Sequence, residues 1–305
     1  MAAPVNGAAF DAKETALLDA ILDKHVPGTK THGAAAGVWI PGRGTWVRAL
    51  GFGNLATMAP FAVTDKIRIA SITKTDVATA VLQLVDSGRL GIDDVLEKDV
   101  PNVSNGDRGT IHQLLNMTSG IFSFSEDDAF TAAFERHPLM AFTPDQAVEI
   151  AGRHAPDFSP GTSLHYSDTN YVLLGIIAEQ VTGQSIETLI TAGILKPFGL
   201  NDTSFLITPD MPDSYARGYF EDPKTGEVRD VTRSNPNVAW TAGAIISTLS
   251  DLKTWAAGVA AGALLEPATQ AARLAATAFP GSPYRYGLGL LEVLGFVGHN
   301  GGILG

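Results

Sequence analysis

A serine and a lysine three residues apart, Ser71 and Lys74, are the side chains of this sequence best suited to chemistry. They follow the short alternating run 66–69 and open an amphipathic helical pattern, so both lie on one face of a first helical turn. A serine hydroxyl becomes a good nucleophile only when a neighbouring base removes its proton, and the lysine amine can reach it. Free backbone N–H groups at a helix start also favour negative charge on the serine oxygen. We therefore predict that Ser71 is a catalytic nucleophile.

The same spacing occurs again at Ser250 and Lys253, where a simpler explanation suffices. Ser250 precedes an acidic residue and an apolar run, as a helix N-cap does. Taken alone, either pair would more often be a cap than a nucleophile. Only the first pair is accompanied by further motifs that fit acyl transfer, so the prediction is made for Ser71.

The composition is that of an ordinary globular protein and argues against several functions. The 305 residues are 45% hydrophobic and 17% charged, which suits one large domain or two intertwined ones. The formal net charge of −11, without a long basic run, argues against nucleic acid and anionic membrane surfaces as partners. There are no cysteines, so disulfides, zinc–thiolate sites and cysteine nucleophiles are excluded. No run approaches the roughly 18 apolar residues of a membrane helix, so we expect no membrane span.

Other common sites and targeting segments are also missing from the sequence. The seven histidines show no metal-ligand spacing, so we expect no metal and no cofactor. No Gly-x-Gly-x-x-Gly follows a strand and opens a helix, which argues against a nucleotide-binding α/β protein. The first residues have neither the basic nor the apolar region of a signal peptide, which fits a cytosolic protein or an exported one without its signal.

The elements around Ser71 can be predicted from periodicity. Residues 11–26 have a helical pattern, and 37–40 and 45–52 read as two strands joined by a Pro-Gly turn. A third short strand over 66–69 delivers the chain to Ser71. The helix that follows runs to Gly88, which suits a helix C-terminus.

The middle of the chain is predicted to be mostly helical, with strands returning after about residue 235. This order favours an α+β fold, with a mainly antiparallel sheet flanked by helices and an inserted helical domain. We expect residues 1–79 and 235–305 to form the sheet domain, residues 80–234 the helical domain, and the active site to lie between them. The helical patterns are 110–117, a helix capped by Thr143, 171–181 and one near Ser250, and the later strands are 244–247, 286–291 and 296–299.

Two further segments complete a recognisable set of motifs. Tyr166-Ser167-Asp168 follows a Pro-Gly turn, and His299-Asn300-Gly301-Gly302 lies near the end. With the Ser-x-x-Lys pair, these segments resemble the three motifs of the serine β-lactamase and penicillin-binding-protein family. The likeness is greatest to D-Ala-D-Ala carboxypeptidases, class C β-lactamases and related esterases. It covers nearly the whole chain, including the flanking segments 82–90, 114–120, 171–175 and 286–290.

The resemblance implies a mechanism through a covalent acyl-enzyme. Ser71 would attack, Lys74 and Tyr166 would move protons, and the backbone N–H groups of Ser71 and Gly302 would form the oxyanion hole. An amine or phenol with an ordinary pKa near 10 is a poor base at neutral pH, so burial and mutual proximity must shift these pKa values. Glycine at 301 and 302 lets a substrate pack against the strand edge. The alternative for Tyr166 is a half-buried structural aromatic.

Three further residues are candidates for the substrate pocket. His299 stands where many relatives have lysine, and it could donate a hydrogen bond to a substrate carboxylate or ester. A structural histidine is the alternative. Trp240 matches the place of an aromatic pocket wall in carboxypeptidase relatives and equally suits a core position. Phe122, just past Ser119-Gly120, is a further pocket candidate.

The sequence departs from the family pattern at two places. Asp168 stands where most relatives have asparagine, and an ionised aspartate only accepts hydrogen bonds. Near Lys74 it would hold that lysine charged, which disfavours efficient penicillin or D-Ala-D-Ala turnover and favours an ester or another acyl substrate. The second departure is the end at Gly305, six residues past His299. Relatives continue through further strands and a helix, so we expect part of the sheet domain to be missing.

The sequence thus predicts a serine hydrolase, in the first place a D-Ala-D-Ala carboxypeptidase-like peptidase. A carboxylesterase and a β-lactamase are the alternatives within the family, and a catalytically silent penicillin-binding sensor is one of another class. The intact Ser71, Lys74 and Tyr166 argue against the sensor. The expected substrate is a small-molecule or peptide acyl donor, such as a cell-wall peptide or a β-lactam. The family favours an extracytoplasmic location, either periplasmic or secreted.

Overall fold

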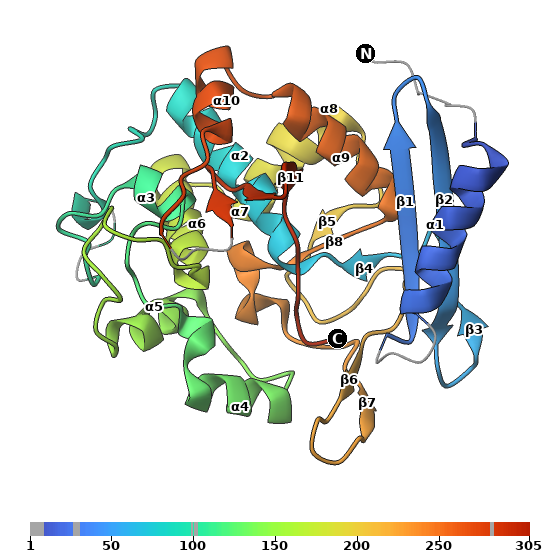
Figure 1. Cartoon of the computed structure of the whole chain (residues 1–305). Coiled ribbons are helices and arrows are strands. Elements are labelled where there is room, and N and C mark those ends of the chain that lie inside the picture. Colours follow the sequence, from blue (N-terminus) through green and yellow to red (C-terminus); the bar gives the residue numbers. More distant parts are fainter. Residues whose placement is uncertain (1–8, 27–30, 99, 101–102, 281–283) are drawn as a thin grey trace.

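The computed structural model describes residues 9–26, 31–98, 100, 103–280 and 284–305 and shows an α+β fold of helices and short antiparallel sheets (Figure 1). Near the N-terminal end a helix packs on a long β-hairpin, which turns at Gly42 with a φ of +72° that suits glycine. The predicted helix and hairpin are confirmed, with both strands longer than expected. In chain order these elements are α1 (Ala12–His25), β1 (Gly33–Ile40), β2 (Gly44–Asn54) and β3 (Ala59–Pro60).

The remaining described strands form three more antiparallel sheets, with the orders β4–β8–β5, β6–β7 and β11–β10–β9. The predicted single strand over 286–291 is wrong. The chain turns at Gly289, where φ is +76° and an added Cβ would lie 2.3 Å from the Cβ of Ala78, so this segment divides between two strands. The bounds are β4 (Ile67–Arg68), β5 (Ser204–Phe205), β6 (Tyr219–Glu221), β7 (Val228–Asp230), β8 (Ile245–Ser247), β9 (Arg285–Tyr286), β10 (Leu291–Val293) and β11 (Phe296–Gly298).

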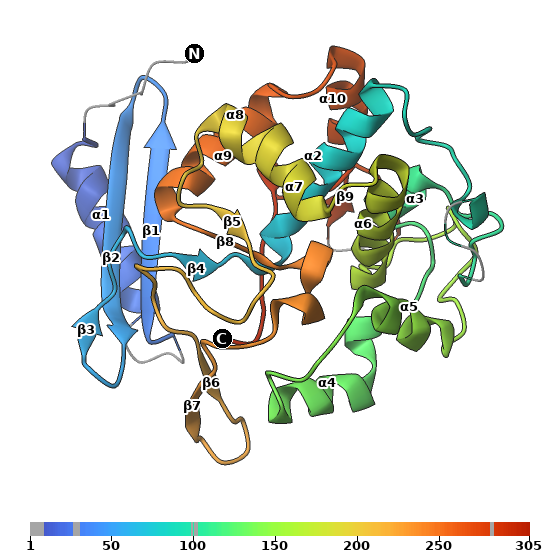
Figure 2. The ribbon, with the colours of Figure 1, turned by 180° about the vertical axis from the view of Figure 1, so that it is seen from behind.

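A large hydrophobic core surrounds two helices, α2 and α6, which pack against each other with α7 beside them (Figure 2). The predicted cap at Thr143 is confirmed, because its side chain and that of Gln146 form a capping box at the start of α5. The bounds are α2 (Thr73–Asp86), α3 (Ile111–Leu115), α4 (Asp128–Arg136), α5 (Pro144–Gly152), α6 (Asp168–Thr182), α7 (Ile186–Ile190) and α8 (Lys196–Phe198).

The second Ser-x-x-Lys pair lies in α9 (Leu249–Ala261), which α10 (Pro267–Leu274) follows. The prediction that Ser250 caps this helix is wrong by two residues. The cap is Thr248, whose side chain accepts a hydrogen bond from the backbone N–H of Asp251, and Ser250 lies inside the first turn. Short turns complete the fold: η1 (Ala70–Ile72), η2 (Leu96–Lys98), η3 (Phe124–Glu126), the π turn η4 (Thr191–Leu195), η5 (Pro236–Val238) and η6 (Trp240–Ala242).

The elements that carry the predicted motifs meet near the middle of the molecule. Figure 1 shows α3 to α6 on one side of α2, and α1 with β1 and β2 on the other. The division into a sheet domain (1–79 and 235–305) and a helical domain (80–234) stays a prediction. Across the part of the chain that the structure describes, no helix is both long and apolar enough to span a membrane.

Candidate active site

Ser71 lies in η1, the tight turn between β4 and α2. The residue before it, Ala70, has a φ of +47°, a left-handed conformation that costs about 1–3 kcal/mol for a side chain other than glycine. Neighbouring hydrogen bonds hold this turn, because Ile69 N–H donates to the Ile245 carbonyl at 3.0 Å and Ile245 N–H donates to Thr73 Oγ1 at 3.1 Å. The sequence therefore presents Ser71 on a strained, well-supported turn, a place where functional side chains are often found.

The Lys74 side chain is fully buried beneath Ser71 and uses all three of its donors. Its Nζ donates to Ser71 Oγ at 3.0 Å, to Asp168 Oδ1 at 2.7 Å and to the backbone carbonyl of Ala242 at 2.8 Å. The structure thus brings together Ser71, Lys74 and Asp168, as the motifs predict, and adds a carbonyl from η6 that the sequence did not single out.

The electrostatics of Lys74 and Asp168 follow from their contact. Burial is the largest single influence on Lys74 and disfavours its ammonium form, but Asp168 and Tyr166 together outweigh it, so the pKa of Lys74 lies above its ordinary value. Burial likewise disfavours the carboxylate, yet the charge and hydrogen bond of Lys74 leave the pKa of Asp168 below its ordinary value. A second donor, Ser125 Oγ, lies 2.7 Å from Asp168 Oδ2. Both charged forms are therefore favoured at neutral pH.

Tyr166 lies beside this pair, with Lys74 Nζ 4.9 Å from its ring centroid. Its hydroxyl is buried and has no hydrogen-bond partner among the described residues. Burial raises the pKa of Tyr166, although the Lys74 charge acts in the opposite direction, so the phenol form is favoured. Lys74 and Ser71 both lie near enough to this hydroxyl to lower its pKa, against the larger effect of burial.

His299 does not present a free donor, contrary to our expectation. Its Nδ1 lies 2.6 Å from the Asn300 carbonyl oxygen, which can only accept, so Nδ1 carries the proton. Its Nε2 then accepts from the Tyr286 hydroxyl at 2.7 Å. Burial, with the nearby Lys74 charge, lowers the pKa of His299 to about 4, so the ring is neutral at neutral pH. Both ring nitrogens are occupied, and no donor remains for a substrate carboxylate.

Gly301 and Gly302 lie beside η1, but their surroundings differ. A Cβ on Gly301 would lie 2.3 Å from the Ile69 carbonyl oxygen, so a glycine is needed for this close approach. A Cβ on Gly302 would meet nothing within 4 Å, and this residue lines hollows on both sides of Ser71. The Gly302 N–H has no acceptor among the described residues, which suits the proposed oxyanion hole.

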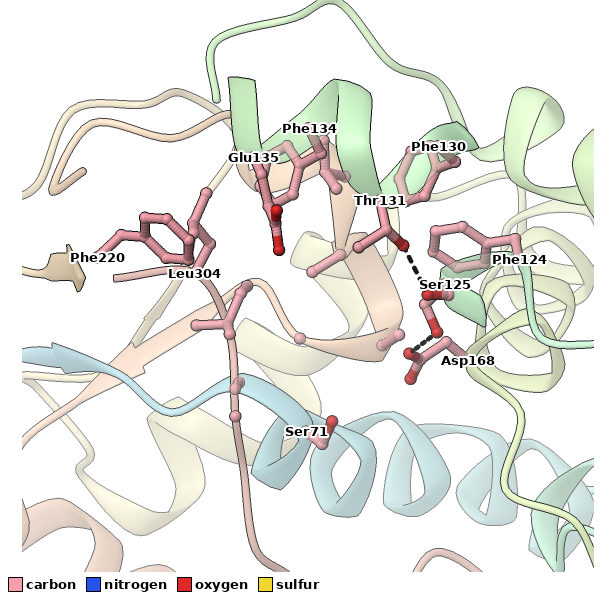
Figure 3. A pocket seen from close by; sticks show the side chains of 17 residues that line it. Ser71, Phe124, Ser125, Phe130, Thr131, Phe134, Glu135, Asp168, Phe220 and Leu304 are labelled. Atoms are coloured by element: carbon pink, nitrogen blue, oxygen red, sulfur yellow. Dashed lines mark hydrogen bonds between the residues drawn. The ribbon is translucent and has the colours of Figure 1, made fainter. Parts of the chain in front are cut away.

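A cavity of about 410 Å³ opens beside Ser71 (Figure 3). Its lining contains four phenylalanines and two carboxylates, and no lysine, arginine or histidine among the described residues belongs to it. A second hollow of about 470 Å³ adjoins Ser71 next to Tyr166 and likewise has no cationic lining residue. The most prominent side chains of the first cavity are Phe124, Ser125, Phe130, Thr131, Phe134, Glu135, Asp168, Phe220 and Leu304.

Trp240 and Phe122 lie outside the linings of both hollows, which corrects our expectation. Trp240 belongs to the main hydrophobic core, and its ring edge packs over Gly175 of α6. It carries a φ of +40° in η6, and this turn directs the Ala242 carbonyl to Lys74. Phe122 stacks on His154 with ring centroids 3.9 Å apart.

Sequence reasoning missed several residues that the structure places at the site. Ser125 binds Asp168, and the four phenylalanines line the cavity, but neither feature forms a motif along the chain. One signal was available for α4, where Phe130, Thr131, Phe134 and Glu135 are spaced to share a helix face. Tyr286 belongs to a segment that supported the resemblance, without any sign that its hydroxyl would reach His299.

The described ranges contain no group of three or more His, Asp or Glu side chains that could together hold a metal ion. Lys74 joins Ser71 and Asp168 by hydrogen bonds, and the Tyr166 ring lies beside its ammonium group.

Comparison with known proteins identifies the family. The sequence matches the family model described as Beta-lactamase over residues 13–305. Because the match spans nearly the whole chain, the chain belongs to the Beta-lactamase family. The resemblance inferred from the three motifs is thereby confirmed.

Solved structures with the same fold include amide hydrolases. A D-stereospecific amidohydrolase from Streptomyces sp. is 35% identical, with a TM-score of 0.84, over 97% of this chain and 88% of that one. A D-amino acid amidase from Ochrobactrum anthropi SV3, in a structure with L-phenylalanine amide, is 25% identical, with a TM-score of 0.81, over 95% and 84%. These similarities agree with the α+β fold expected for a β-lactamase-like protein.

Curated relatives add an esterase. Esterase EstB from Burkholderia gladioli is 29% identical over 232 residues, 72% of this chain and 58% of that protein. Protein flp from Staphylococcus aureus is 32% identical over 208 residues, 66% of this chain and 40% of that protein. The chain thus spans about half the length of these curated relatives. Family and relatives point to a serine hydrolase, and the D-Ala-D-Ala carboxypeptidase activity stays a prediction.

Proposed function

We propose that this chain is a serine hydrolase for amides or esters that join a bulky apolar acyl group to an uncharged leaving group. The observation that carries this proposal is the lining of the cavity beside Ser71, which has four phenylalanines and no cationic side chain. Phenylalanines of this kind favour an apolar or aromatic group by burial of its surface. The amidohydrolase and amidase among the similar structures support an amide substrate.

The proposed reaction begins when Lys74, in its amine form, accepts the proton of Ser71 Oγ, 3.0 Å away. The oxygen bonds to the substrate carbonyl carbon, and the backbone N–H groups of Ser71 and Gly302 hold the oxyanion. Tyr166 gives its proton to the leaving nitrogen or oxygen as that bond breaks, and Lys74 returns a proton to Tyr166. Water then enters by the reverse proton path, releases the acid and restores Ser71.

Substrates with a carboxylate next to the scissile bond fit this site poorly. A D-Ala-D-Ala terminus and a penicillin both carry such a group, and a carboxylate buried without a cationic partner costs about 2–5 kcal/mol. His299 cannot supply the missing charge because its pKa is lowered to about 4, and Lys74 is already bound by Asp168. The site therefore favours an amidase over the carboxypeptidase that the motifs first indicated.

An esterase is the second candidate, and the same neutral, aromatic cavity favours it. Esters have a better leaving group than amides, so an amidase of this design is expected to cleave matching esters as well. The similarity to Esterase EstB supports this candidate. The relative kcat/KM for an ester and an amide with the same acyl group would rank the two activities.

The decisive experiment compares both enantiomers of phenylalanine amide and phenylalanine methyl ester with a peptide that ends in D-Ala-D-Ala. We expect kcat/KM for the uncharged leaving groups to exceed that for the peptide by at least about 30-fold, equivalent to roughly 2 kcal/mol. Intact mass spectrometry should detect an acyl-enzyme that Ser71→Ala abolishes. Faster cleavage of the D-Ala-D-Ala peptide would overturn the proposal, and turnover by Ser71→Ala would overturn the mechanism.

A further inference from the structure

Two hollows meet at the nucleophile. The cavity lined by phenylalanines and the second hollow share Ser71 and Gly302 in their linings. These two residues supply the nucleophile and the proposed oxyanion N–H groups, so the carbonyl group of a bound substrate would lie where the hollows meet. The carbonyl carbon of an amide or ester also carries an acyl substituent and a leaving group, which point away from each other. Each hollow therefore has room for one of these two groups.

Tyr166 indicates which group enters which hollow. It lines the second hollow, whereas Asp168 and Ser125 line the first cavity. In the proposed reaction Tyr166 gives its proton to the leaving nitrogen or oxygen, and a proton donor must lie within hydrogen-bond reach of the atom that it protonates. The leaving group is therefore expected on the Tyr166 side, in the second hollow, and the acyl substituent among the phenylalanines.

The wall of the second hollow is largely apolar. Leu291 and Val293 are two residues apart on β10, so their side chains leave the same face of the sheet. Tyr284, directly before β9, is half-buried and lines the same hollow. Burial and the charge of Glu126 raise the pKa of Tyr284, so its phenol is neutral at neutral pH. No described residue of this lining carries an acidic, basic or histidine side chain.

We propose that the second hollow binds an apolar leaving group about the size of an aromatic ring, and that Tyr284, Leu291 and Val293 select it. The preferred substrates are then N-substituted amides and esters of bulky alcohols, in place of primary amides and methyl esters. Ammonia or methanol would leave most of a hollow of about 470 Å³ to water, whereas a ring buries its surface against the wall. This inference rests on the proposed function, because it needs Tyr166 as the proton donor.

The activity test compares phenylalanine amide with phenylalanine benzylamide, which share the acyl group and release amines of nearly equal basicity. The wild-type protein should cleave the benzylamide with a kcat/KM at least about tenfold higher. Tyr284→Ala should lose about tenfold on the benzylamide and change less than twofold on the primary amide. Val293→Asp, at an exposed position, should lose the same preference because it places a charge in the wall. Phe220→Ala alters the first cavity and should lower both values without changing their ratio.

A binding test separates failure of this inference from failure of the proposed function. Calorimetry with the Ser71→Ala protein should show at least about tenfold tighter binding of the benzylamide than of the primary amide, and Tyr284→Ala should remove the difference. Equal affinity of the two amides, or a kcat/KM ratio that Phe220→Ala changes and Tyr284→Ala does not, would overturn the inference. If the primary amide is cleaved and the benzylamide has no advantage, the proposed function stands and this inference fails. If the binding difference is present but no amide or ester is cleaved, the proposed function fails and the apolar site stands.

Discussion

At the scale of single residues, the replacement of asparagine by aspartate at position 168 has the largest chemical consequence. The carboxylate lies 2.7 Å from Lys74 Nζ, so the pair holds a proton that the proposed base has to lose before it can act. The protonation state of Lys74 therefore differs from that expected in a relative with a neutral asparagine amide at the same place. The pH dependence of the reaction should show this difference.

We predict that Asp168→Asn moves the rise of kcat/KM with pH to lower pH. In the wild type Asp168 and Tyr166 together outweigh burial and raise the pKa of Lys74, so the amine form and the activity appear only at high pH. Without the carboxylate, only Tyr166 opposes the effect of burial, so the pKa of Lys74 falls and the rise should move down by about one pH unit or more, each unit being about 1.4 kcal/mol. The measurement is kcat/KM of an N-acetylated substrate between pH 5 and 11.

A matched variant tests whether the effect comes from the charge. Ser125→Ala removes the Ser125 hydrogen bond to Asp168, along with the one between the Ser125 and Ser123 hydroxyls, and leaves the Asp168 carboxylate on Lys74. Its pH profile should move by much less than that of Asp168→Asn. Equal shifts in the two variants, or a shift of Asp168→Asn to higher pH, would contradict the assignment of Lys74 as the base.

At the scale of elements, the site depends on the close passage of the segment after β11 along η1. Gly301 faces the Ile69 carbonyl, and Gly302 faces the open cavity. The two glycines are adjacent in the sequence and look equivalent there. They differ because one faces a neighbouring backbone and the other faces space that a substrate would fill.

We therefore expect opposite results from alanine at the two positions. Gly302→Ala should fold with near-normal stability and lose kcat/KM, because the methyl group enters the cavity. Gly301→Ala should lower the free energy of unfolding by about 1–3 kcal/mol, because the segment must move from η1 to relieve a 2.3 Å contact. Urea unfolding and activity, measured on both variants, separate these effects. If both variants lower the free energy of unfolding equally, the close contact between residue 301 and the Ile69 carbonyl is refuted.

At the scale of the whole molecule, Lys74 joins three regions that are far apart in sequence. Its ammonium group links α2 to Asp168 at the start of α6 and to Ala242 in η6, inside the main hydrophobic core. A buried ion pair adds little net stability relative to apolar packing, but removing one partner leaves the other charge buried and unpaired. The arrangement of the two proposed domains around α2 is therefore sensitive to this one side chain.

We predict that Lys74→Ala is both inactive and destabilised by about 3–5 kcal/mol at neutral pH, because Asp168 loses its cationic partner. The double variant Lys74→Ala with Asp168→Asn should recover part of that stability without recovering activity. Ser71→Ala removes one of the three hydrogen-bond acceptors of Lys74 and should change the free energy of unfolding by about 1 kcal/mol or less. Chemical denaturation of all three proteins checks this, and a stable Lys74→Ala protein would refute it.

The family, the α+β class and the contact between Ser71 and Lys74 could all be predicted from the amino-acid sequence. These follow from local patterns, because the hydroxyl and the amine lie three residues apart on one helical face and hydrophobic periodicity places that helix after a strand. The effect of Asp168 on Lys74 could also be predicted, because the family motif places both at one site.

The surroundings of these residues could not be predicted from the sequence and follow from the packing of the folded chain. Three of the four phenylalanines and Glu135 come from the adjacent η3 and α4, but they meet Phe220 of β6 and Ser71 of η1 across long sequence separations, and no short-range pattern encodes that meeting. The same is true of the Tyr286 hydroxyl, which occupies His299 and removes the donor expected from its motif. Motif spacing reports which groups can react, whereas packing between distant segments decides which of them remain free for a substrate.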